Sequence, residues 1–170
     1  MKTLISITVA AGLLAACSQE PAATLPSQGD IITELAPGDL PGPVQAAVSA
    51  AMPDMVIQEV LRKERNERVY FDVEGERADG SEIELDILYA DGVAEVVEIQ
   101  RDLAWSDVPA TVREAALSAG AGEPVRIIES VQTDGSIIYE LFAAGQPSDP
   151  AMEVKTSEGK VEVLAERWPH

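Results

Sequence analysis

The 170-residue chain carries 30 Asp and Glu residues against 12 Lys and Arg, which gives a formal net charge of −18 at pH 7. A chain this acidic lacks the basic surface that neutralises nucleic-acid phosphates, and anionic lipid headgroups repel it. Its one cysteine excludes an intrachain disulfide, and its one histidine is the final residue. A held catalytic base and a His/Cys metal-ligand set are therefore missing, so we expect no enzyme, no metal site of that kind and no cofactor.

The first sixteen residues have the features of a secretory signal. Lys2 supplies one positive charge, an apolar run spans residues 4–14, and small residues end it. The run is too short to cross a bilayer as a stable helix, which needs roughly 20 residues. The sequence therefore predicts that residues 1–16 are a signal peptide that is removed.

The signal ends in Leu14-Ala15-Ala16-Cys17. This motif resembles the lipobox of bacterial lipoproteins. The resemblance implies cleavage before Cys17, a diacylglycerol on its sulfur and an acyl chain such as palmitate on its amine, and two or more chains give stable anchoring. Ser18 follows where an Asp would favour the inner membrane in that family, so the resemblance implies an envelope protein that faces the periplasm, with the outer membrane favoured. An ordinary signal peptide with an incidental cysteine is the alternative.

Residues 17–34 show no sustained periodicity and carry Pro21, Pro26 and Gly29. Such residues interrupt regular structure. The sequence predicts a lipidated N-terminus and a flexible tether over this range, with the folded part beginning at Leu35. A flexible chain of this length has a reach of about 25 Å.

One seventeen-residue stretch occurs twice without gaps, since residues 35–51 and 103–119 share seven identities at an offset of 68 positions. Each copy predicts a helix that starts at Pro41 or Pro109, where proline is tolerated. Five apolar positions at helical spacing recur in both copies, which predicts narrow helices that lie against a sheet. The positions are Leu40, Val44, Ala47, Val48 and Ala51, and then Val108, Val112, Ala115, Ala116 and Ala119.

Strand patterns follow each helix. Val69, Phe71 and Val73 alternate with polar residues at a period of two, and Asp91-Gly92 is a strong two-residue hairpin signal. The first copy predicts strands at 55–61, 69–74, 82–87 and 93–99, with polar turns at 62–68 and 76–81. The second copy predicts strands at 124–131, 136–143, 152–156 and 160–165.

These elements predict an α+β fold of two tandem repeats, residues 35–101 and 102–170. Each repeat is one helix followed by a four-stranded antiparallel meander sheet. A lone domain of about 65 residues is marginal in stability. We therefore expect the repeats to pack together, either as one long sheet with both helices on one face or as two sheets edge to edge.

Four short motifs recur in order in the two copies. In the first they are Leu40-Pro41-x-x-Val44, Ile57-x-Glu59, Val69-Tyr70 and Asp91-Gly92; in the second they are Val108-Pro109-x-x-Val112, Ile127-x-Glu129, Ile138-Tyr139 and Glu158-Gly159. Over residues 38–166 the chain resembles PepSY-like and beta-lactamase-inhibitor-like periplasmic modules. The resemblance implies a non-enzymatic module that binds or restrains an envelope protein. The chain departs from the pattern at Val108 and Glu158, and residues 137–142 are apolar on both faces, which predicts that this strand buries both.

Five carboxylates form the main candidate for a partner-binding surface. Period-two geometry puts them on one side of the middle hairpin, where opposed like charges destabilise a sheet. They could meet a basic partner or Ca²⁺, and a solvated acidic face, eased by the basic residues at 62–68, is the alternative. The five are Asp72, Glu74, Glu82, Glu84 and Asp86.

Tyr70 and Tyr139 are aligned as matched positions, and either could anchor a partner, with packing in the core or on the sheet as the alternative. Trp105 is predicted to seal the junction of the copies.

Three functions stay open at this point. The first is a membrane-tethered protein-binding module that restrains an envelope enzyme, with an unknown protein partner. The second is a structural or assembly lipoprotein of the outer membrane. The third is the binding of calcium or a basic ligand by the acidic hairpin.

Overall fold

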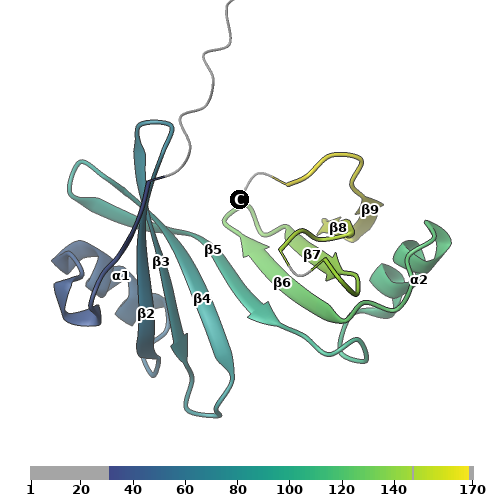
Figure 1. The fold of residues 1–170 in the computed structure, drawn as a ribbon, viewed down its shortest axis with the longest axis horizontal. Coiled ribbons are helices and arrows are strands. Elements are labelled where there is room, and N and C mark those ends of the chain that lie inside the picture. Colours follow the sequence, from purple (N-terminus) through teal and green to yellow (C-terminus); the bar gives the residue numbers. More distant parts are fainter. Residues whose placement is uncertain (1–30, 147, 169–170) are drawn as a thin grey trace, which may run out of the picture.

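The computed structural model describes residues 31–146 and 148–168 (Figure 1). The predicted signal peptide, the lipidated Cys17 and most of the predicted tether lie outside the described residues.

The described chain folds into strands with two short helices. The elements are β1 (Ile31–Glu34), a 3-10 turn (Pro37–Asp39), α1 (Gly42–Ala51), β2 (Val56–Arg65), β3 (Arg68–Glu76), β4 (Glu82–Ala90), β5 (Val93–Asp102), α2 (Ala110–Ser118), β6 (Arg126–Gln132), β7 (Ile137–Phe142), β8 (Met152–Ser157) and β9 (Lys160–Val163). Neither helix is long and apolar enough to span a membrane, so the described part of the chain contains no candidate membrane-spanning helix.

The strands form one antiparallel sheet in sequence order from β1 to β9. The prediction of two repeats, each with its own four-stranded sheet, is therefore wrong. β5 continues past its predicted end at Ile99 to Asp102, and its second half pairs with β6 from Glu98–Gln132 to Asp102–Ile128. This pairing satisfies backbone groups that two separate sheets would leave as open edges.

A further strand lies where the sequence predicts the end of the tether. Residues 31–34 form β1, which pairs with β2 from Ile31–Glu64 to Glu34–Leu61. The pairing is possible because β2 runs through the basic segment that the sequence predicts as a turn. The actual turn is only Asn66-Glu67, and both residues have positive φ, 51° and 63°. The hairpin signal at Asp91-Gly92 is confirmed, with φ of 52° and 81°.

Both helices cover the same face of the sheet. α1 packs on β4 and β5, and α2 packs on β8 and β9. Val44 and Val112, at matched positions of the repeated stretch, are fully buried. In each copy the helix begins one residue after the predicted proline, which is the cap residue.

The apolar side chains under the helices form two clusters. One gathers around Val44 and includes Phe71 and Leu85, and the other gathers around Val112 and includes Tyr139 and Leu141. In Figure 1 the sheet bends along β5 and β6 into a V, with α1 and α2 on the outer sides. The opposite, concave face of the sheet therefore has no helix over it.

Strand β7 is buried on both faces, as its sequence predicts. Ile138 faces the concave side and Tyr139 the core, and they are 0% and 2% exposed. On the concave side Glu153 of β8 is contacted by residues 167 and 168, whereas residues of β3 to β5 and Glu140 of β7 line the cleft described below.

Gly75 tests the packing of β2 against β3, which shift in register between Ile57 and Glu59. A Cβ atom at Gly75 would lie 2.5 Å from the backbone oxygen of Val56 and 2.7 Å from Met55 Cε. We expect Gly75→Ala to reduce the free energy of unfolding by about 1–3 kcal/mol, because backbone must move to relieve this overlap.

Gly42→Ala is the matched control in urea unfolding, since no atom lies within 4 Å of a Cβ at Gly42. At that helical position alanine should be neutral or stabilising by up to about 1 kcal/mol. Equal stability of the two variants would contradict the close contact.

Candidate functional site

The concave face of the sheet holds a cleft with a volume of about 660 Å³. Its lining comes from β2 to β7, so the cleft crosses the line where β5 joins β6. The lining side chains are mostly polar or charged. They are Lys63, Arg65, Asn66, Arg68, Tyr70, Asp72, Glu84, Asp86, Leu88, Val97, Glu98, Gln100, Gln132 and Glu140.

The carboxylates of the cleft floor are brought together by strand register. Asp72 on β3 lies directly opposite Asp86 on β4, and Asp86 lies opposite Glu98 on β5. Glu98 lies opposite Gln132 on β6, whose Nε2 donates a hydrogen bond of 2.9 Å to Glu98 Oε1. Three carboxylates therefore form a row across three strands, and an amide ends it.

The five predicted site carboxylates share the concave face, and the structure divides them. Glu74 lies opposite Glu84, and Glu76 lies opposite Glu82. Asp72 and Asp86 line the cleft, and Glu74 and Glu82 line a smaller hollow of about 70 Å³. Glu84 lines both.

Asp72 is 6% exposed and its charge is compensated by Lys63 of β2, which forms an ion pair with it. The cost of burying a carboxylate falls when a cation lies beside it. The Lys63–Asp72 pair thus stabilises one end of the acidic row.

Asp86 is only partly compensated, because the charge of Lys63 lowers its pKa less than burial and the neighbouring carboxylates raise it. Its Oδ1 atom is buried and has no hydrogen-bond partner among the described residues. Burial, followed by the charges of Glu84 and Glu98, raises the pKa of Asp86 to about 7. Burial also raises the pKa of Glu84 above its usual value. At neutral pH the carboxylates of the cleft floor therefore carry less negative charge than their number implies.

Three carboxylates of the cleft have a spacing that a hard cation accepts. One oxygen from each of Asp72, Glu84 and Asp86 lies within 4.8 Å of the others. Calcium prefers six to eight oxygen ligands, however, and Lys63 already supplies a cation to Asp72. Calcium binding therefore stays a prediction from sequence.

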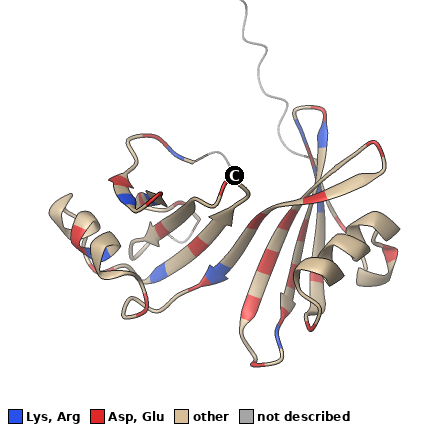
Figure 2. Ribbon diagram, turned by 180° about the vertical axis from the view of Figure 1, so that it is seen from behind, with Lys and Arg blue, Asp and Glu red and all other residues tan. Residues whose placement is uncertain are grey.

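Basic residues gather at one end of the cleft. Lys63, Arg65 and Arg68 belong to the β2–β3 hairpin, which carries the blue residues at one tip of the sheet in Figure 2, whereas red bands cross the middle strands. The cleft thus has an acidic floor and a basic end.

The two tyrosines predicted as partner anchors lie in different places. Tyr70 lines the cleft, whereas Tyr139 is 2% exposed in the core beneath α2. At the offset of 68 positions Tyr139 matches Phe71, which is also buried under a helix. Burial, followed by the neighbouring Glu129, raises the pKa of Tyr139 to about 12. Tyr139 is therefore a core residue, and only Tyr70 is placed to meet a partner.

Trp105 does not seal the line between β5 and β6. It packs on the core beneath α2, with the Arg113 guanidinium 6.0 Å from its ring centre. On the core face that line is bridged by Arg101, whose Nε donates a 2.7 Å hydrogen bond to Glu129. Glu129 in turn contacts Tyr139. Polar side chains thus separate the two apolar clusters.

Sequence reasoning missed Glu98, Gln132 and Glu140 as site residues. Glu98 was not predicted because β5 contains an irregularity. Val96 pairs with Ile87 and Glu98 pairs with Asp86, so Val97 between them has no paired residue on β4. The adjacent apolar pair Val96-Val97 was the available signal, since it breaks the period of two. Gln132 and Glu140 enter the cleft only because β5 pairs with β6.

Neither a protein-family model nor a curated protein sequence matches this chain.

The raised pKa of Asp86 predicts how stability depends on pH. Between about pH 4 and pH 7 Asp86 keeps a proton in the folded state that it has lost in the unfolded chain. The contribution of Asp86 to the free energy of unfolding therefore falls as pH rises. Asp86→Asn removes this term. We expect the stability of the variant relative to the wild type to increase from pH 4 to pH 8 by about 2–4 kcal/mol, measured by urea unfolding at both pH values.

Asp91→Asn is the control, because Asp91 is exposed in a hairpin turn with positive φ that Asn tolerates. Its stability relative to the wild type should change little over the same range. If the Asp86→Asn difference were as flat as that of the control, Asp86 would be solvated and the described row would be wrong.

Proposed function

We propose that this chain is a lipid-anchored protein of the bacterial envelope that binds another protein through the concave face of its sheet. The partner inserts a basic side chain into the cleft between β3 and β6. This is the binding role that the resemblance to PepSY-like and beta-lactamase-inhibitor-like modules implies, and an envelope enzyme that the module restrains is the partner class.

The cleft is the observation that carries this proposal. Both helices cover one face of the sheet, and the other face holds a hollow of about 660 Å³ that opens to solvent. A concave site encloses an inserted side chain, and polar groups placed in it fix the orientation of that side chain. Leu88 and Val97 supply apolar surface beside the carboxylates, which suits a side chain with an apolar stem and a charged end.

Charge supports a basic partner. The chain has a net charge of −18, and the floor of the cleft carries Asp72, Glu84, Asp86 and Glu98, of which Asp72 forms an ion pair with Lys63. Such a surface accelerates association with a basic partner and disfavours acidic ones. A lysine or arginine end would also provide the partner that Asp86 Oδ1 lacks.

Anchoring at Cys17 would place this surface in the periplasm at the end of a tether. The outer membrane is the proposed location, since Ser18 follows the cysteine. A structural or assembly role at the same membrane is the alternative from sequence, and no described feature favours it.

Photocrosslinking in intact cells tests the binding face. A photoreactive amino acid in place of Leu88 lies in the cleft, whereas one in place of Gln45 lies on the exposed side of α1. We expect a defined protein adduct from position 88 and none from position 45. The Glu84→Gln/Asp86→Asn double variant should reduce the adduct at least tenfold.

Glu114→Gln, an exposed change of charge on α2, is the control and should leave the adduct unchanged. Adducts of equal yield from positions 88 and 45, or none from position 88, would contradict the proposed binding face. Calcium added during the reaction identifies a competing cation if it abolishes the adduct at position 88.

Mass spectrometry of the protein extracted from membranes tests the anchor. We expect the mature chain to begin at Cys17 and to carry the mass of a diacylglycerol and one further acyl chain. The lipid provides membrane affinity in proportion to its buried methylene groups, at about 0.8 kcal/mol each. An unmodified cysteine, or a chain that begins elsewhere, would contradict the lipobox prediction.

A further inference from the structure

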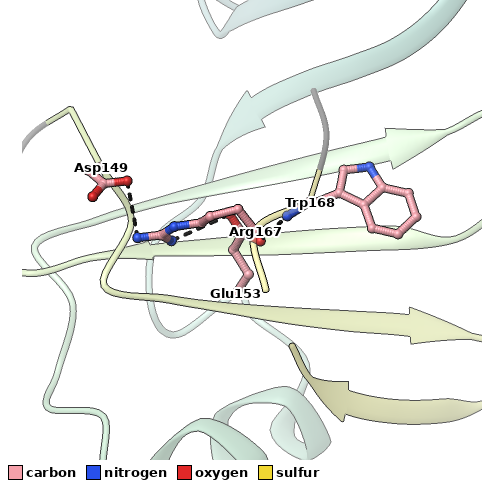
Figure 3. A network of polar contacts seen from close by, with 4 residues as sticks. All are labelled: Asp149, Glu153, Arg167 and Trp168. Carbon is pink, nitrogen blue, oxygen red and sulfur yellow. Dashed lines mark hydrogen bonds and ion pairs between the residues drawn. The ribbon is translucent and has the colours of Figure 1, made fainter. Parts of the chain in front are cut away.

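The chain folds back on its own concave face after β9. Residues 164–168, the C-terminal strap, return over β8 and contact Glu153 (Figure 3). The backbone N–H of Leu164 donates to the Glu153 carbonyl oxygen at 2.9 Å, and that of Trp168 donates to Glu153 Oε2 at 2.7 Å. The ring of Trp168 lies 4.0 Å from Lys155 Nζ.

Arg167 provides the charged contacts of the strap. Its guanidinium forms an ion pair of 3.5 Å with Glu153 and a second of 3.1 Å with Asp149 (Figure 3). An arginine followed by an aromatic residue therefore holds the strap to an acidic position on the sheet.

The strap and the cleft occupy the same face. Glu153 on β8 lies directly opposite Glu140 on β7, and residues paired in this way share a face. Glu140 is also part of the cleft lining. The strap thus sits beside the cleft, on the continuation of the same acidic surface.

Burial shows what the strap covers. Glu153 is 3% exposed, although it is a carboxylate on the face without helices, and the strap supplies its contacts. The outer contacts of the strap are solvated, since the side chains of Arg167 and Asp149 are 47% and 78% exposed. An ion pair this exposed contributes about 0–1 kcal/mol. The contacts to the buried Glu153 carboxylate therefore hold the strap, and a segment that makes the same contacts can replace it.

We propose that the C-terminal strap is a displaceable occupant of the concave face, and that the partner presents an arginine followed by an aromatic residue in its place. Release of the strap exposes Glu153 and extends the acidic surface from the cleft across β7 to β8. The strap therefore prevents a partner in the cleft from extending over β8 until a segment of the same chemistry displaces it. This inference rests on the proposed function for the choice of face.

A peptide that copies the strap tests the proposal directly. The probe is acetyl-Leu-Ala-Glu-Arg-Trp-amide, and its binding is followed by chemical-shift changes at the Glu153 and Lys155 amides of the full chain. The tethered strap competes at an effective concentration on the order of 1 mM. We expect the Arg167→Ala/Trp168→Ala variant to bind the peptide about tenfold more tightly than the wild type does.

Two controls isolate the contacts. A peptide with Gln in place of Arg should bind the double variant at least fivefold more weakly than the probe. Arg126→Ala removes an arginine that pairs with Asp102 and lies 5.7 Å from the Phe142 ring, outside the strap, and should bind the probe as the wild type does.

A second readout uses the strap itself. In a Trp105→Phe background Trp168 is the sole tryptophan of the chain. Saturating acetyl-Leu-Ala-Glu-Arg-Phe-amide, which contains no tryptophan, should increase the quenching of Trp168 by acrylamide. Glu153→Gln should produce the same increase without peptide.

Three outcomes would each overturn the proposal. The first is equal peptide affinity in the wild type and the double variant, and the second is no binding to the double variant. The third is quenching that neither the peptide nor Glu153→Gln affects. These measurements need no natural partner, so their failure is separate from a failure of crosslinking at position 88.

Discussion

Side-chain alternation along one continuous sheet is the constraint on which the rest of the structure depends. Apolar residues at every second position of β3 and β4 must be covered, and α1 covers them. The intervening residues then necessarily face the other way. Because β5 pairs with β6, this division continues through the second half, where α2 covers the same face. The concave face is left for polar side chains.

Strand pairing then forces carboxylates together. Asp72, Asp86 and Glu98 are neighbours across three strands, and like charges directly opposite one another destabilise a sheet. Lys63 reduces this repulsion at Asp72 through an ion pair. At Asp86 the repulsion is reduced because its raised pKa, about 7, leaves the carboxyl group partly protonated. A surface that remains unfavourable in the free protein is one that a basic ligand stabilises on binding.

The local features were predictable from sequence and the long-range ones were not. Helix starts at the prolines, the Asp91-Gly92 turn and the common side of five carboxylates depend on near neighbours alone. The pairing of β5 with β6 depends on residues more than twenty-five positions apart, such as Arg101 and Glu129. Tyr139 shares its residue type with Tyr70, whereas the fixed offset of the repeated stretch matches it to the buried Phe71. The strap, residues 164–168, is held on β8 by contacts of Arg167 and Trp168 with Glu153, which are also long-range.

A ¹³C NMR titration of the Asp86 carboxyl group tests the central claim most directly, namely that the open face of this sheet carries a buried acidic row. The account predicts a midpoint near pH 7, because burial and the charges of Glu84 and Glu98 favour the protonated form. A midpoint near pH 4, the value of a solvated aspartate, would contradict it.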